Sequence, residues 1–380
     1  MAGKRTLKQQ LFNAVDSRYK VGKGRSKHQD KKNGEIKHDI IYSKNEMERL
    51  KDISSNFSKF VREKHPELWR TQLADMPVEI VNEYLKTKTH CSQNTINGYA
   101  DSIKKIFRCA GAVYKTGDFT EMRYINKPLS DRDKEATLRD IALSREVHNA
   151  ALNNMSKTSG GYVGNLLNGI LGSRSDETVH IRAKDFNFEN GTVYIWKGKN
   201  GKPRTLKIPK IDMDKIKKEI FNDGNKKFNP NQSVCGCGVD AIQKGLIRAL
   251  ERVDIKNGTN FAEQIKEKKT NQHAGRKMVA TEKYILNVRS GKFRLIRDKL
   301  IAEHRNGKID LSGLDNSQIS AKVWDIINNR EHEYINKVEL LDIEEKAWSR
   351  VSIFLGHGED RPELKSVYVI TDNTKILRFP

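Results

Sequence analysis

Residues 171–210 read LGSRSDETVHIRAKDFNFENGTVYIWKGKNGKPRTLKIPK and contain the features that decide the fold of this chain. Gly172 follows an apolar helical pattern and is typical of the glycine that ends a helix. Apolar residues then alternate with polar ones on both sides of the turn sequence GKNG: Val193, Ile195, Leu206 and Ile208. Because such alternation around a turn is typical of paired strands, we expect a β-hairpin over residues 192–209, with lysines at its tip.

Upstream of this hairpin the sequence predicts a small helical domain over residues 43–125. Ser43 and Glu46 form a capping box, which is a start signal for a helix, and three stretches with apolar residues at helical spacing follow. A basic face lies beside the third apolar stripe, and its residues are candidate DNA contacts: Lys104, Lys105 and Arg108. Residues 126–140 are polar and lack such a stripe, so we interpret them as a linker to a second domain over residues 141–380.

The charge of the chain points to a polyanionic partner. Lys and Arg number 71 against 49 Asp and Glu, which gives a formal net charge of +22. Nucleic acid is the better candidate than a membrane, because no run of about 18 apolar residues exists and the N-terminus has no apolar signal segment. Four cysteines exclude a disulfide scaffold, and the pair Cys235 and Cys237 has no nearby partners at a metal-binding spacing, so we expect no metal site.

Residues 1–42 form a basic N-terminal segment with weak apolar periodicity. Two interpretations stay open for this segment: a flexible solvated tail, or an arm that becomes ordered on DNA.

Four short motifs in the second domain carry side chains suited to phosphate chemistry. They are LGSRSDE at 171–177, GKNGKPR at 198–204, HAGR at 273–276, and LGH at 355–357 followed by Tyr368. Each motif alone is weak, since a histidine three residues before an arginine is expected by chance in a chain this basic. Their order along the chain is what gives the set its weight.

In this order the motifs resemble those of the tyrosine recombinases, the phage-integrase family. The family carries an arginine at a helix start, a lysine on a β-hairpin, then His-x-x-Arg, Leu-Gly-His and a tyrosine. The matching residues here are Arg174, Lys199, His273, Arg276, His357 and Tyr368. The resemblance covers residues 43–380 and implies a mainly α fold with a small β-hairpin or sheet. It also implies two domains, a helical SAM-like core-binding domain followed by an α+β catalytic domain.

The resemblance implies a site-specific DNA recombinase or integrase that cleaves and rejoins strands through a covalent 3′-phosphotyrosyl intermediate. Tyr368 would attack the phosphodiester, while Arg174 and Arg276 would hold its non-bridging oxygens. The two histidines, His273 and His357, are candidates for activating the nucleophile or stabilising charge. Because the phosphotyrosyl bond conserves the energy of the phosphodiester, the reaction requires neither metal nor ATP, and we expect no cofactor.

The hairpin tip supplies the remaining roles. Lys199 is the expected proton donor to the leaving 5′-oxygen, with Lys202 as the alternative donor. Lys202 and Arg204 are otherwise expected to bind the DNA backbone.

The chain departs from the family pattern at two intervals. Arg276 and His357 are 81 residues apart, several tens more than is typical, so we expect an insertion at about 282–340. Asp342 with Glu345 is a capping-box pattern and predicts the start of the helix that leads to His357. The 11-residue interval from His357 to Tyr368 is slightly long.

Two alternatives of different kinds stay open. One is a topoisomerase IB-like or telomere-resolving DNA strand transferase, which shares the chemistry; the other is a DNA-binding relative that has lost catalysis. The expected partners are double-stranded DNA, further copies of the chain in a homo-tetramer on synapsed sites, and an accessory DNA-bending or directionality factor. The expected location is the cytoplasm, with the protein on the nucleoid when it is bound to DNA.

Overall fold

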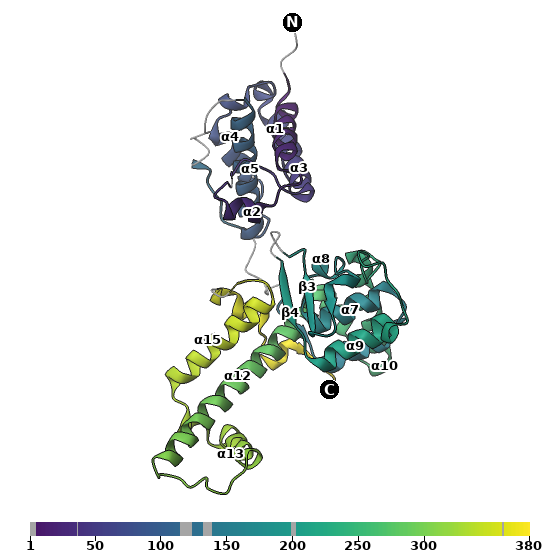
Figure 1. The fold of residues 1–380 in the computed structure, drawn as a ribbon. Coiled ribbons are helices and arrows are strands. Elements are labelled where there is room, and N and C mark those ends of the chain that lie inside the picture. Colours follow the sequence, from purple (N-terminus) through teal and green to yellow (C-terminus); the bar gives the residue numbers. More distant parts are fainter. Residues whose placement is uncertain (1–4, 36, 115–123, 132–138, 199–202, 359–360) are drawn as a thin grey trace. The chain divides into compact units, whose positions relative to one another are not determined.

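The structure is a computed structural model that describes residues 5–35, 37–114, 124–131, 139–198, 203–358 and 361–380. The chain divides into two compact units, Met1–Ala136 and Thr137–Pro380, and each is described by itself (Figure 1). No helix among the described residues is both long and apolar enough to cross a membrane. Most described residues are helical and the sheets are small, so the expected mainly α fold class is confirmed.

The first unit is helical. Its helices are α1 (Leu7–Gly22), α2 (Lys27–Lys32), α3 (Lys44–Lys64), α4 (Val78–Lys86) and α5 (Gln93–Tyr114), with 3-10 turns η1 (Pro66–Leu68) and η2 (Leu73–Asp75). The Ser43 side chain accepts a hydrogen bond from the backbone N–H of Glu46 at 3.2 Å, so the predicted start of α3 is confirmed. Helices α1, α3 and α5 pack on one another around a core that contains Leu50, Phe57 and Phe107.

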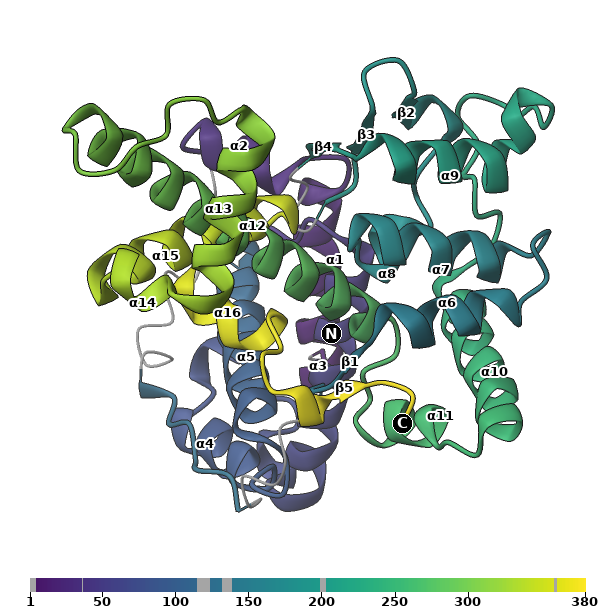
Figure 2. The same cartoon turned by 90° about the horizontal axis from the view of Figure 1, so that it is seen from below.

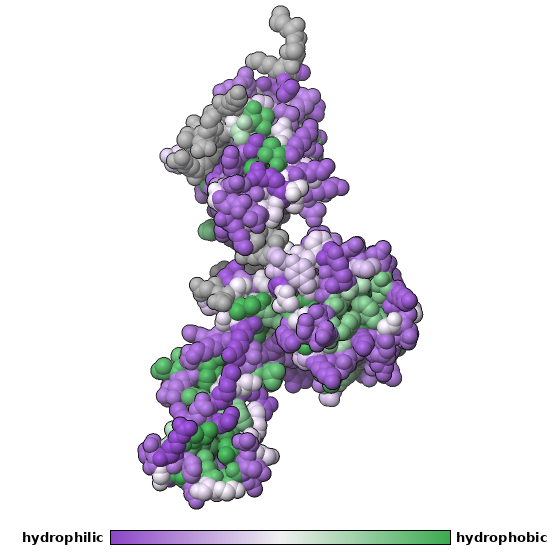
Figure 3. All heavy atoms as spheres, viewed as in Figure 1, coloured by the Kyte–Doolittle hydropathy of each residue, from purple (hydrophilic) through white to green (hydrophobic). Residues whose placement is uncertain are grey.

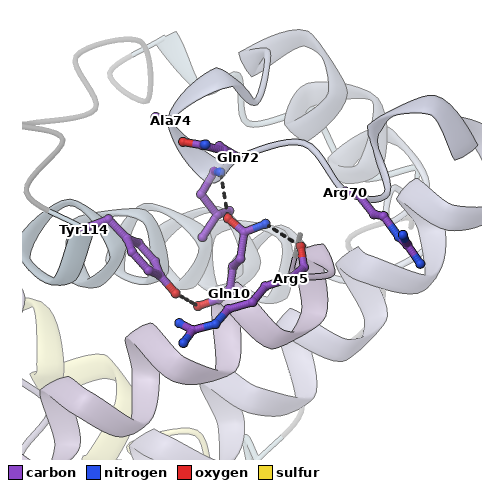
Figure 4. Close-up of a pocket in the computed structure, with 7 residues that line it drawn as sticks. Arg5, Gln10, Arg70, Gln72, Ala74 and Tyr114 are labelled. Atoms are coloured by element: carbon purple, nitrogen blue, oxygen red, sulfur yellow. Dashed lines mark hydrogen bonds between the residues drawn. The ribbon is translucent and has the colours of Figure 1, made fainter. Parts of the chain in front are cut away.

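The expected basic arm over residues 1–42 is wrong for helix α1, which belongs to the core of the first unit. Its buried side chains recur at helical spacing between the basic residues, which is the signal that the sequence analysis missed: Leu7, Leu11, Ala14 and Val15. Gln10 fastens the helix, because its amide donates to the carbonyl of Arg5 at 3.1 Å and accepts from the N–H of Leu73 at 3.1 Å (Figure 4). The Tyr114 hydroxyl donates to the Gln10 carbonyl at 3.0 Å and ties α1 to the end of α5.

The second unit combines two small sheets with many helices. Strands β2 (Phe186–Asn187), β3 (Thr192–Ile195) and β4 (Arg204–Lys207) form an antiparallel sheet, in which Ile195 pairs with Arg204. The predicted β-hairpin is therefore confirmed on both sides of its tip. Strands β1 (Ala142–Leu143) and β5 (Ile376–Leu377) pair in parallel and join the two ends of the unit.

The helices of the second unit are arranged around α7 (Gly160–Leu171) and the first part of α12 (Gln272–Arg305), which pack together. The others are α6 (Arg145–Asn153), α8 (Ser175–Thr178), α9 (Lys210–Phe221), α10 (Val239–Asn257), α11 (Phe261–Glu267), α13 (Asn316–Asn329), α14 (Glu331–Tyr334), α15 (Lys337–Phe354) and α16 (Lys365–Tyr368). The 3-10 turns are η4 (Ala183–Asp185), η6 (Asn222–Gly224), η7 (Pro362–Leu364) and η8 (Asn373–Lys375).

The second half of α12, with α13, α14 and the first half of α15, forms an extension that projects from the rest of this unit (Figures 1 and 2). It has its own apolar cluster: Ile296, Leu300, Leu311, Val323, Ile326, Ile335 and Ile343. Val338 and Leu341 of α15 stay exposed. Figure 3 shows apolar patches among the polar surface of this part of the unit. The expected insertion at 282–340 falls on this extension.

The predicted start of the last long helix at Asp342 is wrong. Helix α15 begins at Lys337, where Asn336 is the N-cap and forms a capping box with Glu339. Asp342 instead lies inside the helix and pairs with Lys346 one turn later, at 2.6 Å. Both positions carry the same residue pattern, and the apolar cluster of the extension favours the earlier start because it buries Ile343 inside the helix.

Candidate active site

Arg174 lies at the turn between α7 and α8. Gly172 ends α7 with φ of 56°, a left-handed conformation that favours glycine, and Arg174 is the N-cap of α8. The buried Ser173 is held from two sides, since Asn168 donates to its carbonyl at 2.8 Å and its hydroxyl bonds that of Thr178 at 2.7 Å. The turn therefore fixes where the Arg174 side chain leaves the backbone.

Arg276 approaches the same place from α12, one turn after His273. It is 1% exposed, and its guanidinium donates to the carbonyl of Gly172 and, at 2.8 Å, to that of Leu355. Burial and the nearby Arg174 lower the pKa of this guanidinium to about 10, although Tyr368 and Glu177 oppose the shift. The arginine thus bridges the end of α7 and the end of α15.

His357 is where the two arginines meet. The Nη2 atoms of Arg174 and Arg276 lie 3.2 Å and 3.1 Å from the His357 Nε2 atom. Because a guanidinium only donates, Nε2 must accept in this arrangement. Two guanidiniums therefore converge on one imidazole and form a strongly positive cluster, Arg174, Arg276 and His357.

Tyr368 lies beside this cluster, at the end of the short helix α16. Its ring centroid lies 4.9 Å from that of His357, and the Arg276 guanidinium lies 5.1 Å from the ring centroid. The chain after it is fixed, because the N–H of Ile370 donates to the hydroxyl of Thr281 at 2.9 Å. The structure therefore brings together four of the six predicted catalytic residues: Arg174, Arg276, His357 and Tyr368.

His273 lies at the start of α12, where it shares a cavity wall with Tyr368. Burial, together with the positive charges of Arg139, Arg276 and Arg174, lowers the pKa of its imidazole to about 4. His273 is therefore uncharged at neutral pH and able to accept a proton at a ring nitrogen.

Glu177 and Arg204 hold Arg174 in place through a shared set of hydrogen bonds. The Glu177 carboxylate, with 2% of its side chain exposed, accepts from Arg174 at 2.8 Å and from both terminal nitrogens of Arg204, at 3.0 Å and 2.8 Å. Burial alone would raise the pKa of this carboxyl, but the hydrogen bonds and charge of Arg204 and the backbone N–H of Arg174 bring it to about 2. The carboxylate therefore stays ionised and holds two guanidiniums.

Arg204, which the sequence analysis expects to bind the DNA backbone, has its guanidinium engaged within the protein. Only 11% of its side chain is exposed, and besides Glu177 it donates to the carbonyl of Phe354 at 3.1 Å. A side chain at Gly356 would meet its guanidinium at 2.8 Å. Its partners come from α8 and from the end of α15, segments distant in sequence, so strand alternation alone could not have revealed them.

The other predicted DNA contacts are placed less favourably or not described. Lys199 and Lys202 lie outside the described residues. In the first unit Arg108 is exposed and Lys104 is half-buried, whereas Lys105 donates to the carbonyl of Ile40 at 2.7 Å. Burial lowers the pKa of Lys105 against the opposing charge of Glu46, so this lysine fastens the segment before α3 and is not a free surface cation.

Lys277 was not singled out from the sequence, yet it also belongs to this region. It follows Arg276 on α12, is 3% exposed, and donates to the carbonyl of Arg139. No pattern of spacing points to it, because adjacent helical residues normally face different directions.

Comparison of the sequence with family models and with curated proteins gives no match. Among solved structures with a similar fold, XerA recombinase is 13% identical over 89% of this chain and 97% of that chain, with a TM-score of 0.31. A lambda integrase tetramer bound to a Holliday junction is 13% identical over 83% of this chain and 81% of that chain, with a TM-score of 0.45. The Tn1549 transposon integrase with transposon right end DNA is 14% identical over 83% of this chain and 99% of that chain, with a TM-score of 0.46. The three solved structures named here are a recombinase and two integrases.

Proposed function

We propose that this chain is a tyrosine recombinase, a site-specific enzyme that cleaves and rejoins DNA strands through a 3′-phosphotyrosyl intermediate. The observation that carries the proposal is the convergence of the Arg174 and Arg276 guanidiniums on one acceptor, 3.2 Å and 3.1 Å away, beside the ring of Tyr368. A phosphodiester bound beside Arg174 and Arg276 would offer its non-bridging oxygens to both arginines. Those donors act most strongly where charge increases in the transition state.

The covalent step balances as follows. The Tyr368 oxygen loses its proton and forms a bond to phosphorus, while the bond from phosphorus to the 5′-oxygen breaks. We assign the tyrosine proton to His273, which is uncharged at neutral pH and lies on the same cavity wall as Tyr368. We assign the proton for the departing 5′-oxygen to Lys199 on the β3–β4 hairpin, with Lys202 as the alternative. Rejoining reverses the step, so no external energy source is required.

The wider biological role follows from this chemistry. The substrate is double-stranded DNA, which also accounts for the net charge of +22. Exchange of strands between two sites needs four cleavages, hence a homo-tetramer on synapsed DNA, with accessory DNA-bending or directionality factors. The enzyme would act where the DNA is, in the cytoplasm on the nucleoid.

Covalent capture tests the proposal without a known target site. The full-length protein is incubated with a pool of nicked random-sequence duplexes, because the nick lets the cleaved end diffuse away and traps the adduct. We expect denaturant-resistant protein–DNA complexes with a blocked 3′ end, a free 5′-hydroxyl and an adduct on the peptide that contains Tyr368. Tyr368→Phe should give none while DNA affinity changes little, since one hydroxyl contributes at most about 1 kcal/mol.

The same experiment separates the alternatives. Enrichment of bound sequences without any adduct would indicate a DNA-binding relative that lacks catalysis. Relaxation of a supercoiled plasmid that lacks the selected sequence would indicate a topoisomerase. An adduct on Tyr334, which lies in α14 of the extension, would overturn the assignment of the nucleophile.

A further inference from the structure

A cavity of about 480 Å³ opens beside Tyr368, and the chemistry proposed above does not use most of it. Three segments distant in sequence form its wall: the chain at residues 139–140, the first turns of α12, and the stretch from Ser366 to Lys375. All three belong to the second unit. Tyr368 and His273 lie on this wall, so the cavity adjoins the nucleophile directly.

The charges on the cavity wall are mostly positive. Arg139, Lys277 and Lys375 line it, against the single carboxylate of Asp140. That carboxylate is already engaged, because the Lys268 ammonium lies 3.3 Å from it. The cavity therefore has a surplus of positive charge.

Lys277 is the most deeply buried cation on this wall, with 3% of its surface exposed. Burial, strengthened by Lys375 and opposed by Asp140, lowers the pKa of its ammonium to about 8. The ammonium donates to the backbone carbonyl of Arg139. An anion that entered the cavity would bring a further negative charge to this buried cation.

The wall is also fixed in place, as a binding site requires. Arg139 has φ of 67°, a conformation that a residue other than glycine rarely adopts. Two hydrogen bonds hold it there: its N–H donates to the carbonyl of Lys268 at 2.8 Å, and its carbonyl accepts from Lys277. The backbone of this segment is thus positioned by groups from α12 and from the loop before it.

We propose that this cavity binds a second DNA backbone phosphate, next to the scissile phosphate on the cleaved strand, through Arg139, Lys277 and Lys375. The inference rests on the proposed function, since it takes the substrate to be a DNA strand. Neighbouring phosphates are separated by one nucleoside, so a strand with its scissile phosphate between Arg174 and Arg276 must place a neighbour close to Tyr368. Holding both phosphates fixes the strand so that the tyrosine attacks in line.

The test measures single-turnover cleavage on nicked duplexes of the sequence selected above. One duplex carries normal phosphates, and each of the others carries one uncharged methylphosphonate within three positions of the cleaved bond. With the wild-type protein we expect one neighbouring position, besides the scissile one, to lower the rate by about tenfold, as for loss of a charge-assisted hydrogen bond. Lys375→Gln should lower the rate on the normal duplex by a similar factor.

The decisive result is the combination of the two changes. If Lys375 contacts that phosphate, the methylphosphonate should lower the cleavage rate of the Lys375→Gln variant little further, because the substitution has already removed the interaction. Arg139→Gln should behave in the same way, and serves if one variant fails to fold. The matched control is Lys256→Gln, an exposed lysine on α10 outside the cavity, which should keep the full methylphosphonate effect.

The inference would be overturned if, at every methylphosphonate position and for both variants, the rate loss from the methylphosphonate and the rate loss from the substitution simply multiplied. That result would leave cleavage itself intact, so the proposed function would stand. Absence of an adduct with wild-type protein on any duplex would instead overturn the proposed function.

Discussion

The two ends of α12 are built on different principles. At its first turns nearly every side chain is buried, and the buried set includes charged groups such as Arg276 and Lys277. Beyond Tyr284 the same helix buries only Ile296 and Leu300, against α13 and α15, while charged side chains such as Arg294 and Arg297 are exposed. One helix thus belongs to a polar site at one end and to a small apolar core at the other.

The difference teaches what holds each region in place. At the site end the cations are fixed by specific acceptors, such as the Leu355 carbonyl for Arg276, so the loss of one group should alter geometry and chemistry. At the distal end apolar burial is not directional, so a truncation there should weaken the extension without moving the site.

The largest effect is expected from removing a guanidinium at the site end. Arg174→Ala should lower single-turnover cleavage on the order of 100–1,000-fold, because a donor to the transition-state oxygens is lost. DNA affinity, measured by filter binding, should change far less. Cleavage within a few fold of wild type would remove Arg174 from the reaction.

A truncation at the distal end should act on stability alone. Leu300→Ala leaves a cavity among the apolar residues of the extension and should cost about 2–5 kcal/mol there. Hydrogen exchange should accelerate in α13 and the second half of α12, while α7 stays protected. Equal acceleration in α7 would show that the two ends of α12 unfold together.

Substitution of Arg204, which holds Glu177, should have an intermediate effect on the cleavage rate. Arg204→Gln removes the paired hydrogen bonds to Glu177 and should lower cleavage by about tenfold or more, with DNA affinity retained. Arg204→Lys should recover only part of the rate, because an ammonium cannot present two parallel donors. A loss of DNA affinity with an unchanged cleavage rate would instead make Arg204 a backbone contact.

Acid should weaken the second unit through its buried histidines. Burial, together with the charges of Arg145 and Lys215, lowers the pKa of His148 to about 3, and the pKa of His273 is lowered to about 4. The unfolded chain then binds more protons than the folded one below pH 6.5, so stability is complete above that pH and declines as the pH falls toward 3. Each histidine contributes a slope of at most about 1.4 kcal/mol per pH unit.

Urea unfolding at pH 7, 6 and 5 measures this slope. His148→Leu removes one titrating group and should flatten it, whatever its effect on stability at pH 7. An unchanged slope would mean that unfolding does not change the protonation of His148.

The smallest effect is expected from the surface ion pair of the extension. Lys346 lies 2.6 Å from Asp342 but is 70% exposed, so Lys346→Gln should change the free energy of unfolding by less than about 1 kcal/mol. Thermal unfolding measures this change. The Lys346–Asp342 pair is as short as the ion pairs of Glu177 but is far more exposed, so the variant separates the effect of contact distance from that of burial. A loss of several kcal/mol would show that contact distance, and not burial, sets the effect.

Several features of the fold could be predicted from short stretches of sequence. The start of α3 at Ser43, the end of α7 at Gly172 and the β3–β4 hairpin were all predicted, because a cap or a turn depends on residues within a few positions of one another. The same local signals gave a wrong start for α15, where two capping-box patterns compete and packing decides. They also missed α1, whose apolar stripe is interrupted by lysines.

The sequence by itself determined the candidates for the chemistry, in the order Arg174, His273, Arg276, His357 and Tyr368. Only the tertiary structure decided which of them meet, since Arg174 and His357 are 183 residues apart and touch through a helix end and a loop. It also decided that Arg204 pairs with Glu177, a partner that the expectation of a DNA backbone contact did not include. The physical reason is that local hydrogen bonds and apolar periodicity depend only on residues that are close in sequence. The burial of a charge, and so its role, depends on what the rest of the chain places over it.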